Sequence, residues 1–159
     1  EFTGVTWHYV NAELDAGEII CQKKIDLDET STAFQIVQKG MELGKHCFKE
    51  MLPRFLDERI NGIKNGKGEH VYKSSQFPQN GEICETDDGE LIARMLRTYD
   101  YGVLALMGVL RFRSGDKVYR IRNYAIYKDD FFIAGKQLHA YHRELNKGAY
   151  KIQLTFEDN

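Results

Sequence analysis

The sequence predicts an α/β unit followed by a small β-rich unit, and three observations carry this prediction. Two β-rich runs, at residues 4–10 and 18–27, precede one long amphipathic pattern at residues 28–62. The composition then shifts to Gly, Lys, Ser, Asn and Gln over residues 64–80, as in a linker. The remainder alternates with the short period of strands and contains one helical segment. We therefore expect two units, at residues 1–63 and 81–159, joined by a linker at 64–80.

The first unit is expected to contain two strands and a covering helix. The strands flank a polar, turn-like segment at residues 11–17. Because the first strand follows the N-terminus with no turn or helix cap before it, we expect the chain to begin within a longer protein. Side-chain oxygens at residues 28–31 can cap the helix that follows. Apolar residues recur along that helix mainly at three- and four-residue steps: Phe34, Val37, Met41, Phe48, Met51 or Leu52, and Phe55. Pro53 is expected to break or kink it, and Asn61-Gly62 to close it.

The second unit is expected to be mainly antiparallel. Asp87-Asp88 precedes a short helix at residues 90–99, for which Gly102 is a plausible stop. A turn at residues 114–116 predicts a hairpin of the runs before and after it. The predicted strands cover residues 109–113, 117–122, 124–127, 131–134, 140–144 and 149–156.

Composition and charge exclude several classes of protein. Hydrophobic residues at 42% and charged residues at 29% exclude a disordered chain. A net charge of -2 gives no global reason to expect nucleic acid or an anionic membrane, and no apolar run is long enough to span a bilayer. Three widely spaced cysteines predict reduced thiols, and hence the cytoplasm. The sequence does not fix an oligomeric state, and a homo-oligomer is compatible with it.

The most specific pattern lies at residues 4–22, Gly-Val-Thr-Trp-His-Tyr-Val-Asn-Ala-Glu-Leu-Asp-Ala-Gly-Glu-Ile-Ile-Cys-Gln. It resembles a stretch of the 10-formyltetrahydrofolate-dependent formyltransferases, which include the methionyl-tRNA, sugar-nucleotide and glycinamide ribonucleotide enzymes. Formyltetrahydrofolate deformylases share much of it. The resemblance implies that residues 1–63 are the distal part of a Rossmann-like formyltransferase domain. Residues 81–102 more faintly resemble the start of the small domain that follows it in several such enzymes.

The resemblance also implies roles for individual residues. Asp15 falls on the family's catalytic aspartate, His8 and Asn11 on positions that shape the site, and Gly17 on the glycine of the same turn. In such enzymes an amine attacks the formyl carbon of 10-formyltetrahydrofolate, and an Asn and a His hold the oxyanion. The aspartate orients that His and helps to remove the amine proton.

The family's Asn-x-His motif and its Leu-Pro-rich loops normally precede this stretch, and the sequence contains neither. Asn123 and Asn146 are followed two residues later by Ala125 and Gly148 rather than by His. We therefore expect a fragment of the enzyme that is inactive alone.

Each of these residues also has a structural interpretation that needs no chemistry. Asp15 can simply make a turn with Gly17, and Asn11 can initiate one. His8 can be an ordinary, partly buried strand histidine.

Two further groups of residues have side chains of types that bind ligands. Four arginines alternate on one predicted hairpin and are candidates to bind an anionic acceptor, against the alternative of a solvated strand face: Arg111, Arg113, Arg120 and Arg122. His139 and His142 have no Cys or carboxylate partner at a ligand spacing, so no metal site is expected.

The sequence thus favours formyl transfer from 10-formyltetrahydrofolate to an amine, on an amino sugar nucleotide or an aminoacyl-tRNA. A formyltetrahydrofolate hydrolase, in which water replaces the amine, is the first alternative. A non-catalytic substrate-recognition or assembly module is the second, because an exposed half-sheet tends to pair with another chain. The acceptor amine is not identified by the sequence.

Overall fold

The computed structural model describes residues 2–13, 15–58, 60–66, 76–104, 106 and 108–158. The chain divides into two compact units. The first comprises Glu1–Asp28 and Ile36–Tyr72, and the second comprises Glu29–Gln35 and Lys73–Asn159. Part of the predicted linker, residues 67–75, lies outside the described residues. The predicted combination of strands and helices is confirmed in both units.

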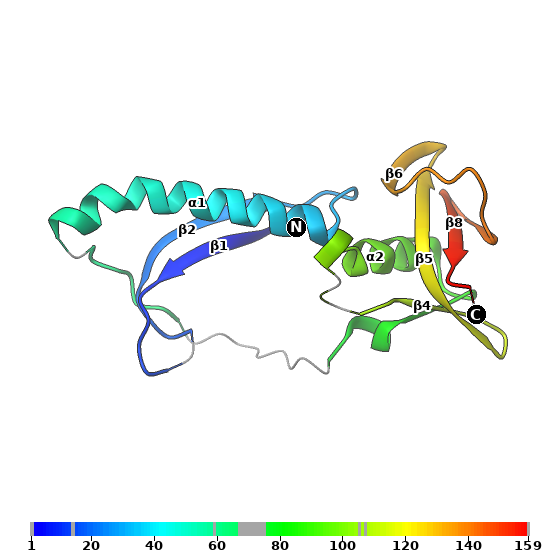
Figure 1. Ribbon diagram of the computed structural model, residues 1–159, viewed down its shortest axis with the longest axis horizontal. Helices are drawn as coiled ribbons and strands as arrows, with labels where there is room; N and C mark the ends of the chain where they lie inside the picture. Colours follow the sequence, from blue (N-terminus) through cyan, green and yellow to red (C-terminus); the bar gives the residue numbers. More distant parts are fainter. Residues whose placement is uncertain are drawn as a thin grey trace. The chain divides into compact units, whose positions relative to one another are not determined.

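The first unit is built on a hairpin of two antiparallel strands, β1 (Phe2–His8) and β2 (Ile19–Asp26). Their pairing ends in a register shift between Trp7 and His8, where the chain leaves the ladder. The long helix α1 (Ala33–Asp57) runs along this hairpin (Figure 1). The Trp7 indole Nε1 donates a hydrogen bond of 3.1 Å to the carbonyl oxygen of Gly44 on α1.

The ends of α1 differ from those that the sequence predicts. The helix begins after Thr32, whose hydroxyl accepts from Gln35 N (3.3 Å) while the Gln35 carboxamide accepts from Thr32 N (3.0 Å). This reciprocal capping box satisfies two backbone donors at once. Of the break or kink expected at Pro53, the break does not occur, because Glu58 N still donates to Arg54 O (3.0 Å) and α1 extends to Asp57. Proline removes the hydrogen bond that its own nitrogen would donate and crowds the carbonyl of the preceding turn, but the hydrogen bonds that follow it can still form.

A small core lies between α1 and the hairpin. Its buried members are Cys47, Met51 and Ile60, with Trp7, Ile20, Cys21, Leu43 and Phe55 packed around them. Burial raises the pKa of the Cys47 thiol, so this cysteine behaves as a small apolar side chain.

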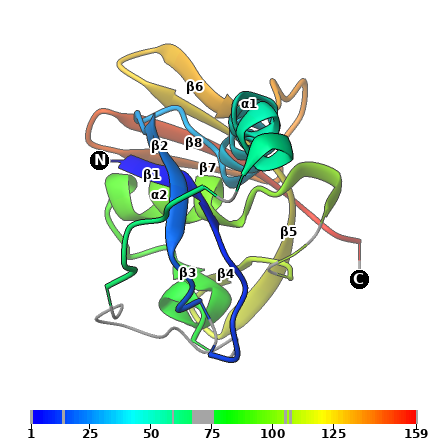
Figure 2. The same ribbon diagram turned by 90° about the vertical axis from the view of Figure 1, so that its left-hand side faces the viewer.

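The second unit contains a mixed sheet, which has six strands among the described residues. Its order is β3-β4-β5-β8-β7, with β6 also paired to β5. The strands are β3 (Glu82–Cys84), β4 (Arg111–Ser114), β5 (Lys117–Lys128), β6 (Phe131–Gly135), β7 (Arg143–Lys147) and β8 (Tyr150–Phe156). β3 pairs with β4 in parallel, and the other pairs are antiparallel. Figure 2 shows the sheet from another side, with β7 next to β8.

β5 joins two segments that the sequence predicts as separate strands, residues 117–122 and 124–127. Along its pairing with β8, Ile121 faces Phe156 and Asn123 faces Thr155. β5 therefore carries one additional residue, Arg122, which makes a β-bulge. The bulge interrupts the alternation and explains why the strand looks like two.

The helix α2 (Gly89–Tyr99) packs on this sheet, and short 3₁₀ turns lie at Pro78–Gly81 and Gly102–Leu104. The Asp88 carboxylate caps α2 by accepting from Leu91 N (2.8 Å), as the acidic pair predicts. The core of the unit includes Ile83, Ile92, Phe112, Ile126, Ile152 and Leu154. The strand predicted at residues 140–144 lies instead at Arg143–Lys147, so residues predicted as its connection pair with β8.

Candidate functional site

The loop from β1 to β2 folds back so that its two ends meet. Tyr9 N donates to Glu18 O at 3.0 Å. Gly17 is buried inside the loop, and a Cβ atom there would lie 1.5 Å from the Tyr9 carbonyl oxygen. Only glycine permits this approach, so the close contact between Gly17 and the Tyr9 backbone depends on the absence of a side chain.

Asp15 lies in this loop with a left-handed backbone, at φ 52°. Asp adopts that conformation more readily than most residues. Its side chain is 82% exposed, which leaves the carboxylate accessible to a substrate. Its backbone oxygen accepts a hydrogen bond of 2.5 Å from the Asn65 carboxamide, which ties the loop to a segment beyond α1.

His8 is fixed beside Asp15 by a contact through its other ring nitrogen. Nδ1 lies 3.0 Å from the Tyr9 carbonyl oxygen, and because a carbonyl can only accept, Nδ1 carries a hydrogen. The remaining nitrogen, Nε2, lies 3.8 Å from Asp15 Oδ1. This distance is too long for a direct hydrogen bond, but it forms an ion pair when the imidazole is protonated. The loop thus presents a carboxylate and a proton-accepting nitrogen side by side.

The segment after α1 holds the loop from the side. Ile19 and Ile63 exchange two backbone hydrogen bonds of 2.8 Å. A Cβ atom on Gly62 would lie 2.5 Å from Glu18 Cβ, and the Tyr9 hydroxyl donates to Ile60 O at 2.9 Å. Asn65 was assigned to the linker by composition. Its contact with Asp15 joins residues 50 positions apart, and no local pattern signals it.

Asn11 is engaged within its own turn. Its carboxamide oxygen accepts from Glu13 N at 3.0 Å, which is an Asx turn. The structure therefore brings His8, Asp15 and Gly17 together and gives Asn11 a local contact. Leu14, the remaining residue of the Leu-Asp-x-Gly pattern, lies outside the described residues.

The predicted arginines lie in the second unit, and three of them have carboxylate partners. Arg113 Nε donates to Glu82 Oε1 at 2.6 Å, and Arg111 Nε lies 3.6 Å from Glu82 Oε2. Arg120 pairs with Arg111 in the β4–β5 ladder, and its Nε lies 3.1 Å from Glu157 Oε2. The hydrogen bond from Arg113 lowers the pKa of the Glu82 carboxyl. These ion pairs set two carboxylates, Glu82 and Glu157, against the four arginine charges.

Arg122 differs from the other three arginines. It occupies the bulge of β5 and lines a cavity of about 210 Å³ with Tyr99, Asp100 and Tyr124. No carboxylate partner of Arg122 is found within the described part of the chain. Among the four arginines, Arg122 is therefore the one for which the described residues provide no carboxylate contact.

His139 and His142 have no metal-binding neighbours in the part of the chain that the structure describes. Among those residues, no group of three His, Cys, Asp or Glu side chains is arranged to hold a metal ion. Nor is any described helix long and apolar enough to cross a membrane.

Known proteins share both the motif and the fold. Residues 1–52 match the family profile described as formyl transferase. Methionyl-tRNA formyltransferases from Bacillus thuringiensis and Bacillus cereus are 27% identical over 97 residues, which are 61% of this chain and 31% of theirs. The chain thus spans about a third of the length of the curated relatives that it matches.

Solved structures agree on the fold. An N-formyltransferase from Helicobacter canadensis superposes with a TM-score of 0.61 at 15% identity, covering 98% of this chain and 56% of that one. The methionyl-tRNA formyltransferase from Clostridium thermocellum superposes with a TM-score of 0.58 at 21% identity. The match covers 99% of this chain and 57% of that one. These structures have the α/β fold that the sequence predicts, and the predicted fold class is confirmed. The chain is thus similar to formyltransferases in its first 52 residues by family profile and over 97 residues by sequence.

Proposed function

We propose that the protein transfers a formyl group from 10-formyltetrahydrofolate to an amine, with Asp15 accepting the amine proton. The observation that carries this proposal is the pairing of His8 Nε2 with Asp15 Oδ1 at 3.8 Å. The pair lies within the residues that match the formyl transferase profile. A carboxylate beside an imidazole is a standard arrangement for moving protons at neutral pH.

The chemistry requires two proton movements. Transfer forms a bond from the formyl carbon to the amine and breaks the bond to the folate nitrogen. One proton must therefore leave the amine, and one must reach the folate. The folate co-substrate supplies the formyl group. The exposed Asp15 carboxylate fits the first task, and the proton that it accepts can then pass to the folate nitrogen, so that the two movements balance. The His8 imidazole beside it can orient the carboxylate.

The identity of the co-substrate and acceptor is supported by what related proteins bind. The Helicobacter canadensis structure is described as a complex with folinic acid and dTDP-3-aminofucose. The structure of WlaRD, a sugar 3N-formyltransferase, was determined in the presence of dTDP and 5-N-formyl-THF. The curated relatives act on methionyl-tRNA by name. An amino sugar nucleotide and an aminoacyl-tRNA are accordingly the acceptors that we propose to test.

We further propose that the 159 residues alone do not complete the reaction. The chain covers 31% of its relatives' length, and its sequence contains no Asn-x-His to hold an oxyanion. Loss of one oxyanion donor lowers kcat by about 10²–10³-fold. Because all three cysteines are free thiols, the cytoplasm is the compartment that we propose for the activity.

The test is a product assay on the complete protein and on the 159-residue chain, with 10-formyltetrahydrofolate and each acceptor. A formylated amine supports the proposal. Formate released without acceptor would instead indicate the hydrolase, and failure of the complete protein to bind folate would favour a recognition module.

Variants then connect the activity to the loop. Asp15→Asn keeps the left-handed turn but removes the base, so kcat should fall about 10²–10⁴-fold with an unchanged thermal midpoint. Asp26→Asn, at an exposed carboxylate on the same hairpin, is the matched control and should keep full activity. A folded Asp15→Asn enzyme with more than about a tenth of wild-type kcat would reduce Asp15 to a turn residue.

A further inference from the structure

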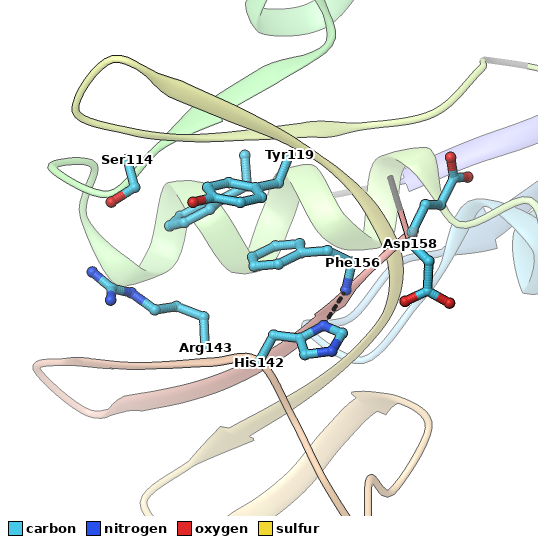
Figure 3. A pocket seen from close by; sticks show the side chains of 8 residues that line it. Ser114, Tyr119, His142, Arg143, Phe156 and Asp158 are labelled. Carbon is cyan, nitrogen blue, oxygen red and sulfur yellow. Dashed lines mark hydrogen bonds between the residues drawn. The ribbon is translucent and has the colours of Figure 1, made fainter.

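A second cavity, of about 390 Å³, lies in the second unit at one end of its sheet (Figure 3). It is separate from the loop of His8 and Asp15, and its residues belong to β4, β5, β8 and the chain around them. The volume falls within the range of small-molecule sites, about 300–1,000 Å³.

Three rings with nearly parallel planes form one wall of this cavity. Figure 3 shows Tyr119, Phe156 and His142 one above another. The centroids of Tyr119 and Phe156 are 4.7 Å apart with 20° between the ring planes. Those of His142 and Phe156 are 5.7 Å apart with 19°. A column of parallel rings favours a flat aromatic guest over a branched apolar one.

Backbone contacts fix this wall in place. Phe156 N donates to His142 Nδ1 at 2.9 Å, and His142 N donates to Leu154 O at 2.9 Å. Because Nδ1 accepts, the neutral imidazole carries its hydrogen on Nε2 and is a donor there. The rings are therefore pre-arranged, and a guest need not order them on binding.

Polar groups at the rim can recognise the edge of a heterocycle. The Arg143 guanidinium and the Ser114 hydroxyl both contact the Glu85 carboxylate, which holds them at the cavity. Arg143 retains further N–H donors beyond that ion pair. Asp158 contributes acceptor oxygens at the other side (Figure 3).

The charges argue against a phosphate group in this cavity. Arg143 is balanced by Glu85, and Glu157 by Arg120. Asp158 then leaves one negative charge among these residues. An uncharged guest is favoured over an anionic one.

We propose that this cavity binds the base of a nucleoside, stacked on one end of the column that the Tyr119, Phe156 and His142 rings form. The guest is a neutral, planar nitrogen heterocycle that carries both donors and acceptors on its edge. This binding needs neither the folate nor the His8–Asp15 pair, so it stands or falls independently of formyl transfer.

The test is calorimetric titration of the complete protein with adenosine, cytidine, AMP and ribose. We expect saturable binding of at least one nucleoside with Kd below about 1 mM, no binding of ribose, and weaker binding of AMP than of adenosine. Shifts of the Tyr119 and His142 ring protons in NMR spectra should accompany binding. Failure of both nucleosides to bind, or AMP binding more tightly than adenosine, would overturn the proposal.

Variants locate the site. His142→Ala and Tyr119→Leu remove the two ends of the ring column, and at least one of them should weaken nucleoside binding by about 5- to 150-fold, the range for loss of one stacking partner. Phe131→Leu, at a 76% exposed ring on β6 away from the cavity, is the control and should change nothing. Asp158→Asn removes the remaining negative charge, so the affinity for AMP should rise toward that for adenosine. Equal affinities for wild type, His142→Ala and Tyr119→Leu, all shown to be folded, would place the nucleoside elsewhere and refute the assignment.

Discussion

His8 Nε2 lies 3.8 Å from Asp15 Oδ1 while His8 Nδ1 is held 3.0 Å from the Tyr9 carbonyl oxygen. The contact with Tyr9 requires a hydrogen on Nδ1. In the neutral imidazole, Nε2 then faces Asp15 with its lone pair. The two residues come from the end of a strand and from a left-handed turn, so the pair depends on the loop between them.

Such a pair should act as a unit in catalysis. In the complete protein we expect His8→Gln and Asp15→Asn each to lower kcat, because each removes one partner of the same proton path. The double variant should lose less than the sum of the two losses in activation free energy. Steady-state kinetics on the four proteins measures this coupling, and additive losses would show that the residues act separately.

Gly17→Ala should open the loop. Its Cβ would lie 1.5 Å from the Tyr9 carbonyl oxygen, so the chain must move. We expect a loss of about 1–3 kcal/mol in stability and a fall in kcat, because the Asp15 carboxylate shifts away from His8. Gly66→Ala is the matched control, since a Cβ there meets no atom within 4 Å. The measurements are the thermal midpoint and kcat of both variants. Equal values for Gly17→Ala and Gly66→Ala would contradict the steric argument.

The arginines should not contribute equally if the acceptor is phosphorylated. Arg122→Gln should raise the acceptor KM and weaken its salt dependence, because that guanidinium has no carboxylate partner within the described residues. Arg120→Gln should have the smaller effect, since Glu157 already neutralises Arg120. Acceptor KM at two salt concentrations tests the order, and an effect of Arg120→Gln equal to or larger than that of Arg122→Gln would refute it.

Tyr124 should make the second unit sensitive to alkali. Burial, and then its hydrogen bond of 2.5 Å to Asp100, raises the pKa of the Tyr124 hydroxyl. The unfolded chain ionises from about pH 10, while the folded chain keeps the proton, so this residue lowers stability as the pH rises above about 10. The contribution reaches about 1.4 kcal/mol per pH unit.

Tyr124→Phe removes that dependence. It should cost about 1–3 kcal/mol at pH 7, because Asp100 loses a donor. Above pH 10 its free energy of unfolding should fall less steeply than that of wild type. Denaturant unfolding at pH 7 and from pH 9 to 11 measures both effects, and parallel slopes would show that Tyr124 titrates normally.

The local parts of the fold and site were predictable from sequence, whereas contacts between distant segments were not. Alternation and capping patterns gave the strands around the loop, and the resemblance placed Asp15 next to His8. Asn65 was missed because its contact with the loop spans 50 residues. The pairing of Arg111 and Arg113 with Glu82 was missed because Glu82 lies on a parallel neighbouring strand that is distant in sequence.

The bulge at Arg122 divides β5 into two halves whose inward-facing residues have odd numbers before the bulge and even numbers after it. Tyr119 and Ile121 pack on the core at odd positions, and Tyr124 and Ile126 do so at even positions. Side chains of a strand alternate with a period of two, so one additional residue moves the inward series from odd to even numbers. A deletion of a single residue between Ile121 and Tyr124 would therefore exchange inside for outside along half of the strand. The length of this strand is fixed as strictly as the identity of its buried residues.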